Sequence, residues 1–252
     1  MDSEVFTDPY VYPGTPVLKN KLGLKDPARF KEAEYRATWI RREEMGDELT
    51  KDSFDLSHLQ AINYQLFQDL FDWAGELRQV EIAKGSSTFH PSIRIAEAGD
   101  NLKSWISTSG LLESPSDDQF ISAMANLLEK VNYIHPFREG NGRTQRAFLD
   151  QVASVSGRRL AWRNVGQHEH LRAMIKAFNE GSGKPLEAVI AEVMAPPLDG
   201  LDPLEPDVYS VAPPSAWPQT PFHNDPSTCG EPTTKGPPCK RKGRCPYHGE
   251  TR

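Results

Sequence analysis

Apolar residues recur every three or four positions in several stretches of the chain, which is the spacing of one face of an α-helix. The clearest stretch runs from Ser57 to Trp73, with Ser57 as the expected N-cap and Gly75 as the expected stop. A second stretch begins at Ser116 or Asp117 and ends at Pro136. Its apolar face consists of Phe120, Met124, Leu127, Leu128, Val131 and Ile134. Shorter helices fit Asp100 to Ser107, Glu169 to Phe178 and Pro185 to Val193. The pattern predicts a mainly α-helical protein.

The pattern changes between Glu76 and Ile95, where Leu77, Val80 and Ile82 alternate with polar residues. Such alternation predicts a strand rather than a helix. Small and polar residues with turn propensity follow, from Lys84 to Pro91. We therefore expect a short β-hairpin in this region.

The C-terminal quarter has a composition of its own. Twelve of the 21 prolines lie between Pro196 and Pro238. Residues 196–224 are typical of an extended, Pro-rich linker. Residues 225–252 form a short tail with a net charge of +3 that contains all three cysteines. We expect a helical domain over residues 1–195, followed by this linker and this tail.

The overall composition is ordinary for a globular protein, with 37% hydrophobic and 25% charged residues. A net charge of -6 excludes bulk basicity as a way of binding nucleic acid or an anionic membrane. No apolar stretch approaches the ~20 residues of a membrane helix, and the first residues are acidic, unlike a signal peptide. These features predict a cytoplasmic protein without a membrane partner.

The segment 135–146, His-Pro-Phe-Arg-Glu-Gly-Asn-Gly-Arg-Thr-Gln-Arg, carries the candidate chemistry. It lies between two apolar stretches and therefore predicts a loop between two helices. The second helix should begin near Asn141, so that its unpaired N–H groups and the positive end of its dipole face the loop. Gly140 and Gly142 have no Cβ atoms and let a ligand approach the backbone. The loop is therefore a predicted anion site.

Four side chains indicate what the anion site would do. Arg143 and Arg146 share a helix face near a helix N-terminus, an unfavourable place for cations that a bound polyphosphate would offset. Glu139 is the acidic residue of segment 135–146, and its carboxylate is suited to bind Mg²⁺ beside phosphate oxygens. The unperturbed pKa of a histidine side chain, about 6.5, suits His135 to act as a general base at neutral pH. Together they predict phosphoryl or nucleotidyl transfer.

This segment resembles the signature of the Fic family: His, any residue, Phe, any residue, Asp or Glu, Gly-Asn-Gly-Arg, two residues, Arg. Residues from Tyr12 to Gly23 are also similar to bacterial members, so the resemblance covers roughly residues 1–195. It implies a Fic-type helical bundle. It also implies an enzyme that transfers AMP from ATP to a Tyr, Thr or Ser hydroxyl of a target protein and releases pyrophosphate.

The resemblance also implies individual roles. The catalytic residues would be His135, Glu139, Asn141 and Arg143. The ATP phosphates would be held by Gly140, Asn141, Gly142, Arg143 and Arg146. In this scheme His135 deprotonates the target hydroxyl, Glu139 holds Mg²⁺ on the α- and β-phosphates, and Phe137 packs inward. The expected hairpin is similar to the family's flap, which pairs with the target main chain. Its residues would be Lys84, Gly85, Ser86, Ser87, Thr88 and Phe89, with Phe89 as a clamp.

Many Fic proteins carry a self-inhibiting helix, in which Ser or Thr is followed after three residues by Glu and then by Gly or Asn. This chain has no such sequence, because Glu139-Gly140 is preceded at the required position by His135, and Glu180-Gly181 by Lys176. The resemblance therefore implies a toxin held by a separate small antitoxin. Members of that subclass often modify type II topoisomerases.

The tail contains four soft metal ligands within twenty residues: Cys229, Cys239, Cys245 and His248. Four such ligands predict a closed tetrahedral Zn²⁺ site. The alternative is a disordered tail with reduced thiols. The basic residues among the ligands leave a nucleic-acid partner open, and with it a rival function, namely a nucleic-acid-binding protein whose Fic-like body is a scaffold. A second rival is a Fic enzyme that uses another donor and transfers UMP or phosphocholine.

Two further charged motifs have ordinary interpretations. His168-Glu169-His170 lacks the spacing of a helical metal pair, and we expect it at the surface. Arg41-Arg42-Glu43-Glu44 is expected to be a solvated helix face.

Overall fold

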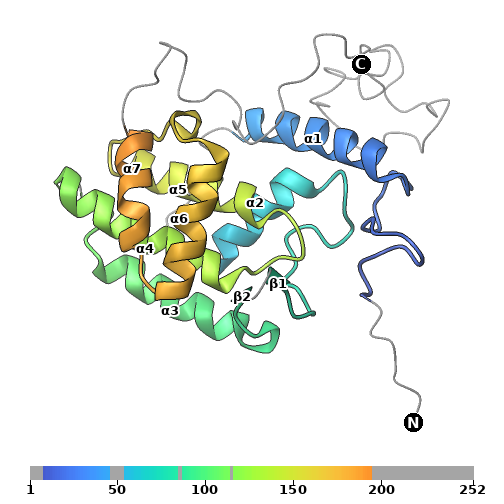
Figure 1. Ribbon diagram of the computed structural model, residues 1–252, viewed down its shortest axis with the longest axis horizontal. Coiled ribbons are helices and arrows are strands. Elements are labelled where there is room, and N and C mark those ends of the chain that lie inside the picture. Colours follow the sequence, from blue (N-terminus) through green and yellow to red (C-terminus); the bar gives the residue numbers. More distant parts are fainter. Residues whose placement is uncertain (1–7, 46–53, 85–86, 114–115, 195–252) are drawn as a thin grey trace, which may run out of the picture. The chain divides into compact units, whose positions relative to one another are not determined.

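The computed structural model describes residues 8–45, 54–84, 87–113 and 116–194, and this part of the chain is mainly helical (Figure 1). Its helices are α1 (Pro27–Glu43), α2 (Leu56–Phe67), α3 (Ile95–Thr108), α4 (Asp117–Ile134), α5 (Asn141–Val155), α6 (Gln167–Glu180) and α7 (Glu187–Met194). Single 3₁₀ turns are η2 (Ser92–Arg94), η3 (Trp162–Asn164) and η4 (Lys184–Leu186). Within this part of the chain, no helix has the length and apolar character needed to cross a membrane. The predicted linker and the predicted zinc ligands lie outside the described residues.

Helix α4 begins where its capping residues predict. Ser116 is the N-cap, its hydroxyl accepts the N–H of Gln119, and the Gln119 side chain returns to the Ser116 backbone. This reciprocal pair is a capping box, which satisfies two backbone donors that a helix start leaves open. The helix ends at Ile134, directly before His135 and Pro136.

Helix α2 is shorter than its apolar spacing predicts. The N-cap is Asp55 rather than Ser57, because the Asp55 carboxylate accepts the N–H of His58. The helix ends at Phe67 rather than Trp73, and residues 68–74 continue as successive turns. These turns keep Leu70 and Phe71 fully buried, so they reproduce the helical spacing without a helix. Gly75, with a φ of 78°, follows these turns, so it is not the residue that ends the helix, contrary to expectation.

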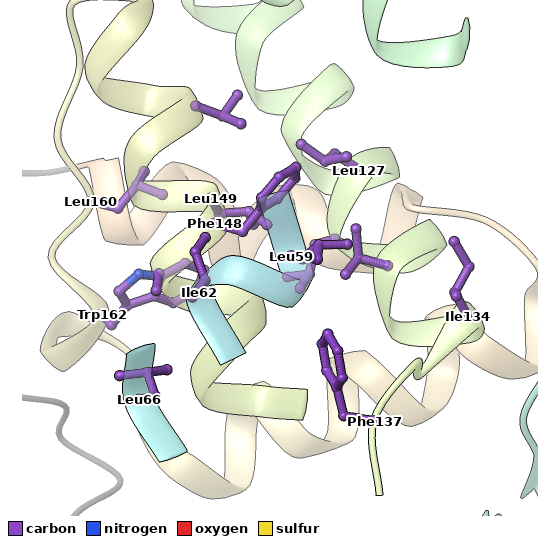
Figure 2. Packing of buried hydrophobic residues seen from close by; sticks show 14 of the residues in the cluster. Leu59, Ile62, Leu66, Leu127, Ile134, Phe137, Phe148, Leu149, Leu160 and Trp162 are labelled. Carbon is purple, nitrogen blue, oxygen red and sulfur yellow. The ribbon is translucent and has the colours of Figure 1, made fainter. Parts of the chain in front are cut away.

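The core lies where α2 and α4 pack against α5. Figure 2 shows Leu59 and Ile62 of α2 beside Phe148 and Leu149 of α5, all fully buried. Burial of each such side chain contributes about 1.5–3 kcal/mol. Phe137, from the loop before α5, is also buried in this cluster, as expected. The core therefore anchors both the helix and the loop that carry the candidate site.

The expectation of a solvated face at Arg41-Arg42-Glu43-Glu44 is wrong for the arginines. Arg41 is buried, and its Nε and Nη2 lie 2.6 and 2.7 Å from the two carboxylate oxygens of Asp69. Arg42 donates to Asp150 of α5. Acids on elements that pack against α1 supply these partners, and the local charge pattern does not reveal them. His170 is likewise buried, against Trp162, whereas His168 and Glu169 are exposed.

The hairpin region forms a two-stranded antiparallel ladder, β1 (Ala83–Lys84) with β2 (Ser87–Thr88). Ala83 pairs with Thr88 and Lys84 with Ser87, and the N–H of Phe89 donates to the Ile82 carbonyl. The alternating residues Leu77 and Val80 lie outside these strands, so the ladder is shorter than the alternation predicts. Gly85 and Ser86, between the strands, lie outside the described residues.

Candidate active site

The loop between α4 and α5 presents the start of α5 to its surroundings. Gly140 is the N-cap of α5, and its carbonyl accepts the N–H of Thr144 in the first helical bond. Gly140 has a φ of 82°, a left-handed conformation that glycine adopts without the steric penalty of a Cβ. Helix α5 begins at Asn141, as the sequence predicts. The N–H groups of its first turn therefore point into the loop.

His135 occupies the C-cap of α4 in a left-handed conformation that is uncommon outside glycine, with a φ of 45°. Its backbone N–H donates to Val131, and its ring Nδ1 lies 3.1 Å from the Asn132 carbonyl. A carbonyl only accepts, so this contact requires the proton on Nδ1. The neutral imidazole then carries its lone pair on Nε2, the atom that can accept a proton.

Phe89 lies on His135. The two rings stack, with centroids 3.7 Å apart and an interplanar angle of 13°, and the Phe89 side chain is buried. Phe89 also packs on Phe178 of α6, with the two rings nearly perpendicular. The predicted clamp residue of the flap thus contacts the predicted base, and its contact with a target stays a prediction.

Arg78 joins the hairpin region to the candidate base, a link that local sequence patterns do not reveal. Its side chain is fully buried. Nε donates to the His135 carbonyl at 2.8 Å, Nη1 to the Val80 carbonyl at 2.7 Å, and Nη2 to the His90 carbonyl. Its own backbone N–H donates to the Pro136 carbonyl. One guanidinium therefore ties both ends of the flap region to the beginning of the loop.

Replacing Arg78 with lysine is expected to lower the free energy of unfolding by about 3 kcal/mol or more, because each buried carbonyl left without a donor costs ~1–3 kcal/mol. Lysine keeps the charge but has one nitrogen, which cannot reach all three carbonyls. Urea unfolding followed by circular dichroism measures the change. Arg94→Lys is the control, since Arg94 forms an exposed pair with Glu97, and we expect a change of ~0.5 kcal/mol or less. Equal losses in the two variants would contradict the bridging role of Arg78.

Two asparagines hold the shape of the loop. The side-chain amide of Asn141 accepts the N–H of Phe137 at 3.0 Å and donates to the Phe137 carbonyl at 2.7 Å. Asn63 of α2 donates to the Glu139 carbonyl and to the Thr144 hydroxyl. Asn141 was expected in an anion hole, and its side chain serves the loop backbone here. Its backbone N–H, at the start of α5, is the group left to meet an anion.

The charged residues of the segment lie around the first turn of α5. The Glu139 carboxylate accepts the N–H of Gly140 at 2.9 Å and lies 3.7 Å from Nη2 of Arg143. A Cβ built on Gly142 would lie 3.6 Å from Nη1 of Arg146, so the Arg146 guanidinium reaches back to the helix start. The structure therefore brings Glu139, both arginines and the N–H groups of α5 together in one place.

The donors here fit Mg²⁺ held mainly by a ligand. Across the described part of the chain, no group of three His, Cys, Asp or Glu side chains could hold a metal by itself. Mg²⁺ commonly takes one or two carboxylates and completes its octahedron with phosphate and water oxygens. Glu139 is a half-exposed carboxylate beside the helix start and fits that requirement.

Two residues of α1 also contact the site, and no local sequence pattern indicates that they do. Glu34 accepts from Nη2 of Arg143 at 2.6 Å, and the Thr38 hydroxyl accepts from Nη1 at 3.0 Å. Burial raises the pKa of the Glu34 carboxyl, and the charge of Arg143 only partly opposes that rise. More than one hundred residues separate these partners in sequence, so only the fold brings them together.

Comparisons with known proteins relate this chain to a single family. The Fic/DOC family model matches residues 53–153. The probable protein adenylyltransferase Fic of Salmonella typhimurium is 37% identical over 158 residues, which cover 63% of this chain and 78% of that protein. Protein adenylyltransferase VbhT of Bartonella schoenbuchensis is 35% identical over 171 residues, 68% of this chain and 36% of that protein.

A solved structure shows the same fold. The N-terminal Fic domain of an effector protein from Bartonella sp. AR 15-3 matches with a TM-score of 0.68 and 26% identity, over 74% of this chain and 91% of that chain. The mainly helical architecture expected from the sequence is therefore a Fic-type fold. With most of the Salmonella relative covered at 37% identity, the chain belongs to the Fic/DOC family.

Proposed function

We propose that this chain is a protein adenylyltransferase that transfers AMP from ATP to a Tyr, Thr or Ser hydroxyl of a target protein and releases pyrophosphate. The observation that carries the proposal is the loop geometry, with His135 at one end and the first turn of α5 at the other. The relatives named protein adenylyltransferase support the same reaction.

The proposed chemistry begins at His135. Its Nε2 accepts the proton of the target hydroxyl, and the hydroxyl oxygen attacks the α-phosphorus of ATP. A bond forms between that oxygen and the α-phosphorus, and the bond from the α-phosphorus to the bridging oxygen of the β-phosphate breaks. The Asn132 carbonyl, which accepts from Nδ1, holds the ring in the tautomer that this step needs.

The proposed binding of ATP relies on the start of α5. The backbone N–H groups of Gly142 and its neighbours meet phosphate oxygens, since a helix N-terminus favours negative charge. Arg143 and Arg146 hold the β- and γ-phosphates of the leaving group. Glu139 would hold Mg²⁺, which would neutralise phosphate charge when bound.

Mass spectrometry of a cell lysate tests this function directly. The purified chain is added with Mg²⁺ and either ATP, UTP or CDP-choline, and modified peptides are identified by the mass of the added group. Adenylyl groups on hydroxyl side chains of a protein, in the ATP sample alone, would establish the reaction. Uridylyl or phosphocholine groups would identify another donor, and no modification with any donor would refute transfer.

We also propose that the chain is a toxin restrained by a separate small antitoxin and that its target is a type II topoisomerase. The proposal is based on the missing self-inhibitory sequence. The purified chain should then be active by itself. Activity that appears only after a Glu within this chain is mutated would contradict it.

For the tail we propose one structural Zn²⁺ at Cys229, Cys239, Cys245 and His248, and a catalytic domain that ends near residue 195. Metal analysis of the full chain should find about one zinc ion per chain, and Cys239→Ser should lower it, because four-ligand structural sites bind one ion. A chain ending at Pro196 should still transfer AMP. A reduced, unchelated sample without zinc would contradict the metal site, and loss of transfer on truncation would contradict the domain boundary.

A further inference from the structure

Arg143 is held from two other helices. Glu34 and Thr38, one turn apart on α1, each accept one bond from its terminal nitrogens. The guanidinium carbon also lies 4.7 Å from the centre of the Phe67 ring of α2, and that ring is buried. The residues matched by the family model begin at 53, so α1 lies before them.

These contacts leave Arg143 able to bind more. A guanidinium carries several N–H donors, and Glu34 and Thr38 engage one each. A long side chain that is already held in place loses less rotamer freedom when a ligand binds. The planar guanidinium also has fixed donor directions, so holding both terminal nitrogens orients the remaining N–H donors.

The same helix also contacts α5 one turn beyond the second arginine, Arg146. Arg42 of α1 donates to Asp150, which lies one turn after Arg146 on α5. At a spacing of four residues, Arg146 and Asp150 share a face of α5. Helix α1 is therefore linked to α5 at two points: Glu34 pairs with Arg143, and Arg42 pairs with Asp150.

From these contacts we infer that Glu34 and Thr38 are positioning residues, which hold Arg143 in the orientation that binds the phosphates of ATP. The inference rests on the proposed function for the identity of the ligand. By this inference, α1 contributes to ATP binding by positioning Arg143. The opposite possibility, that Glu34 competes with ATP for Arg143, predicts an effect of opposite sign.

The test measures ATP binding in the presence of Mg²⁺ by isothermal titration calorimetry on the full chain. Glu34→Ala should weaken ATP binding by about 10-fold or more, because Arg143 loses the acceptor that fixes its orientation and must be ordered by the ligand instead. Thr38→Val, which removes one acceptor at similar volume, should give a smaller loss. Glu32→Ala is the matched control, because Glu32 lies on the same helix, is half exposed and pairs with Arg36.

A double-mutant cycle separates positioning from a general structural effect. If Glu34 acts through Arg143, Glu34→Ala should change ATP binding little in an Arg143→Ala background, because coupled residues are not additive. Circular dichroism confirms folding, and Glu34→Gln, which keeps the size and an acceptor oxygen, supplies a milder variant with an intermediate loss.

Unchanged or tighter ATP binding by Glu34→Ala, or an equal loss with and without Arg143, would overturn the inference. Transfer by the wild-type chain is measured in parallel. A wild-type chain that binds ATP but transfers no AMP would refute the proposed function, while the ATP-binding comparison would still decide the role of Glu34. A wild-type chain that binds no ATP would overturn both.

Discussion

Replacing His135 with alanine is expected to lower the rate of AMP transfer by about 10²–10⁴-fold, the usual loss on removing a general base. The expectation follows from the contact between Nδ1 and the Asn132 carbonyl, which places the lone pair on Nε2. ATP binding should change little, because the phosphate contacts proposed here come from α5 rather than from His135. Single-turnover transfer to a purified target, together with calorimetric ATP titration, measures both quantities.

His168→Ala is the matched control for His135→Ala, since His168 is an exposed histidine in the first turn of α6. It should transfer AMP at the wild-type rate. A His135→Ala variant that kept wild-type transfer would remove the base assignment. A variant that lost ATP binding to the same degree as transfer would instead give His135 a role in binding.

The loop and its helices could be predicted because their signals are local. Pro136 cannot continue α4, Ser116 forms a capping box, and Gly140 supplies the left-handed residue before α5. Each of these effects acts within a few residues along the chain. The start of α5 at Asn141 is therefore readable from the sequence.

The groups that support the loop could not be predicted in the same way. Arg78 bonds carbonyls of His135 and His90, and Glu34 bonds Arg143, so each link crosses between separate elements. A backbone carbonyl has no sequence signature, and a Glu on a helix looks the same whether it faces water or an arginine. The wrong expectation for Arg41 has this cause, because its partner Asp69 lies in the turns after α2.

The predicted length of α2 was wrong for a related reason. Leu70 and Phe71 keep helical spacing although α2 ends at Phe67, because consecutive turns also bring every third or fourth residue to the core. Burial determines the apolar pattern, and the backbone can meet it with more than one local structure.

Gly140→Ala is expected to destabilise the protein by about 2–5 kcal/mol, with the strain of a left-handed alanine adding to an overpacked core. A Cβ at this position would lie 2.1 Å from Cε2 and 2.2 Å from Cζ of Phe67. The ring cannot easily move, since it is buried, stacks on Phe71 and has the Arg143 guanidinium over its face. Any relief of the clash would displace Arg143 or the loop, so transfer should also fall by about 10²-fold.

Gly142→Ala is the control for stability, two residues further along the chain. Among the described residues its Cβ would meet only Arg146 Nη1, at an ordinary 3.6 Å, and its backbone is helical. Alanine in a helix is favoured over glycine by about 1 kcal/mol, so the free energy of unfolding should stay the same or rise. Urea unfolding measures the stability of both variants, one with a clash between the new Cβ and Phe67 and one without such a clash. Equal stabilities would mean that Phe67 can yield to a Cβ at Gly140, and the close approach of loop and ring would then not restrict residue 140 to glycine.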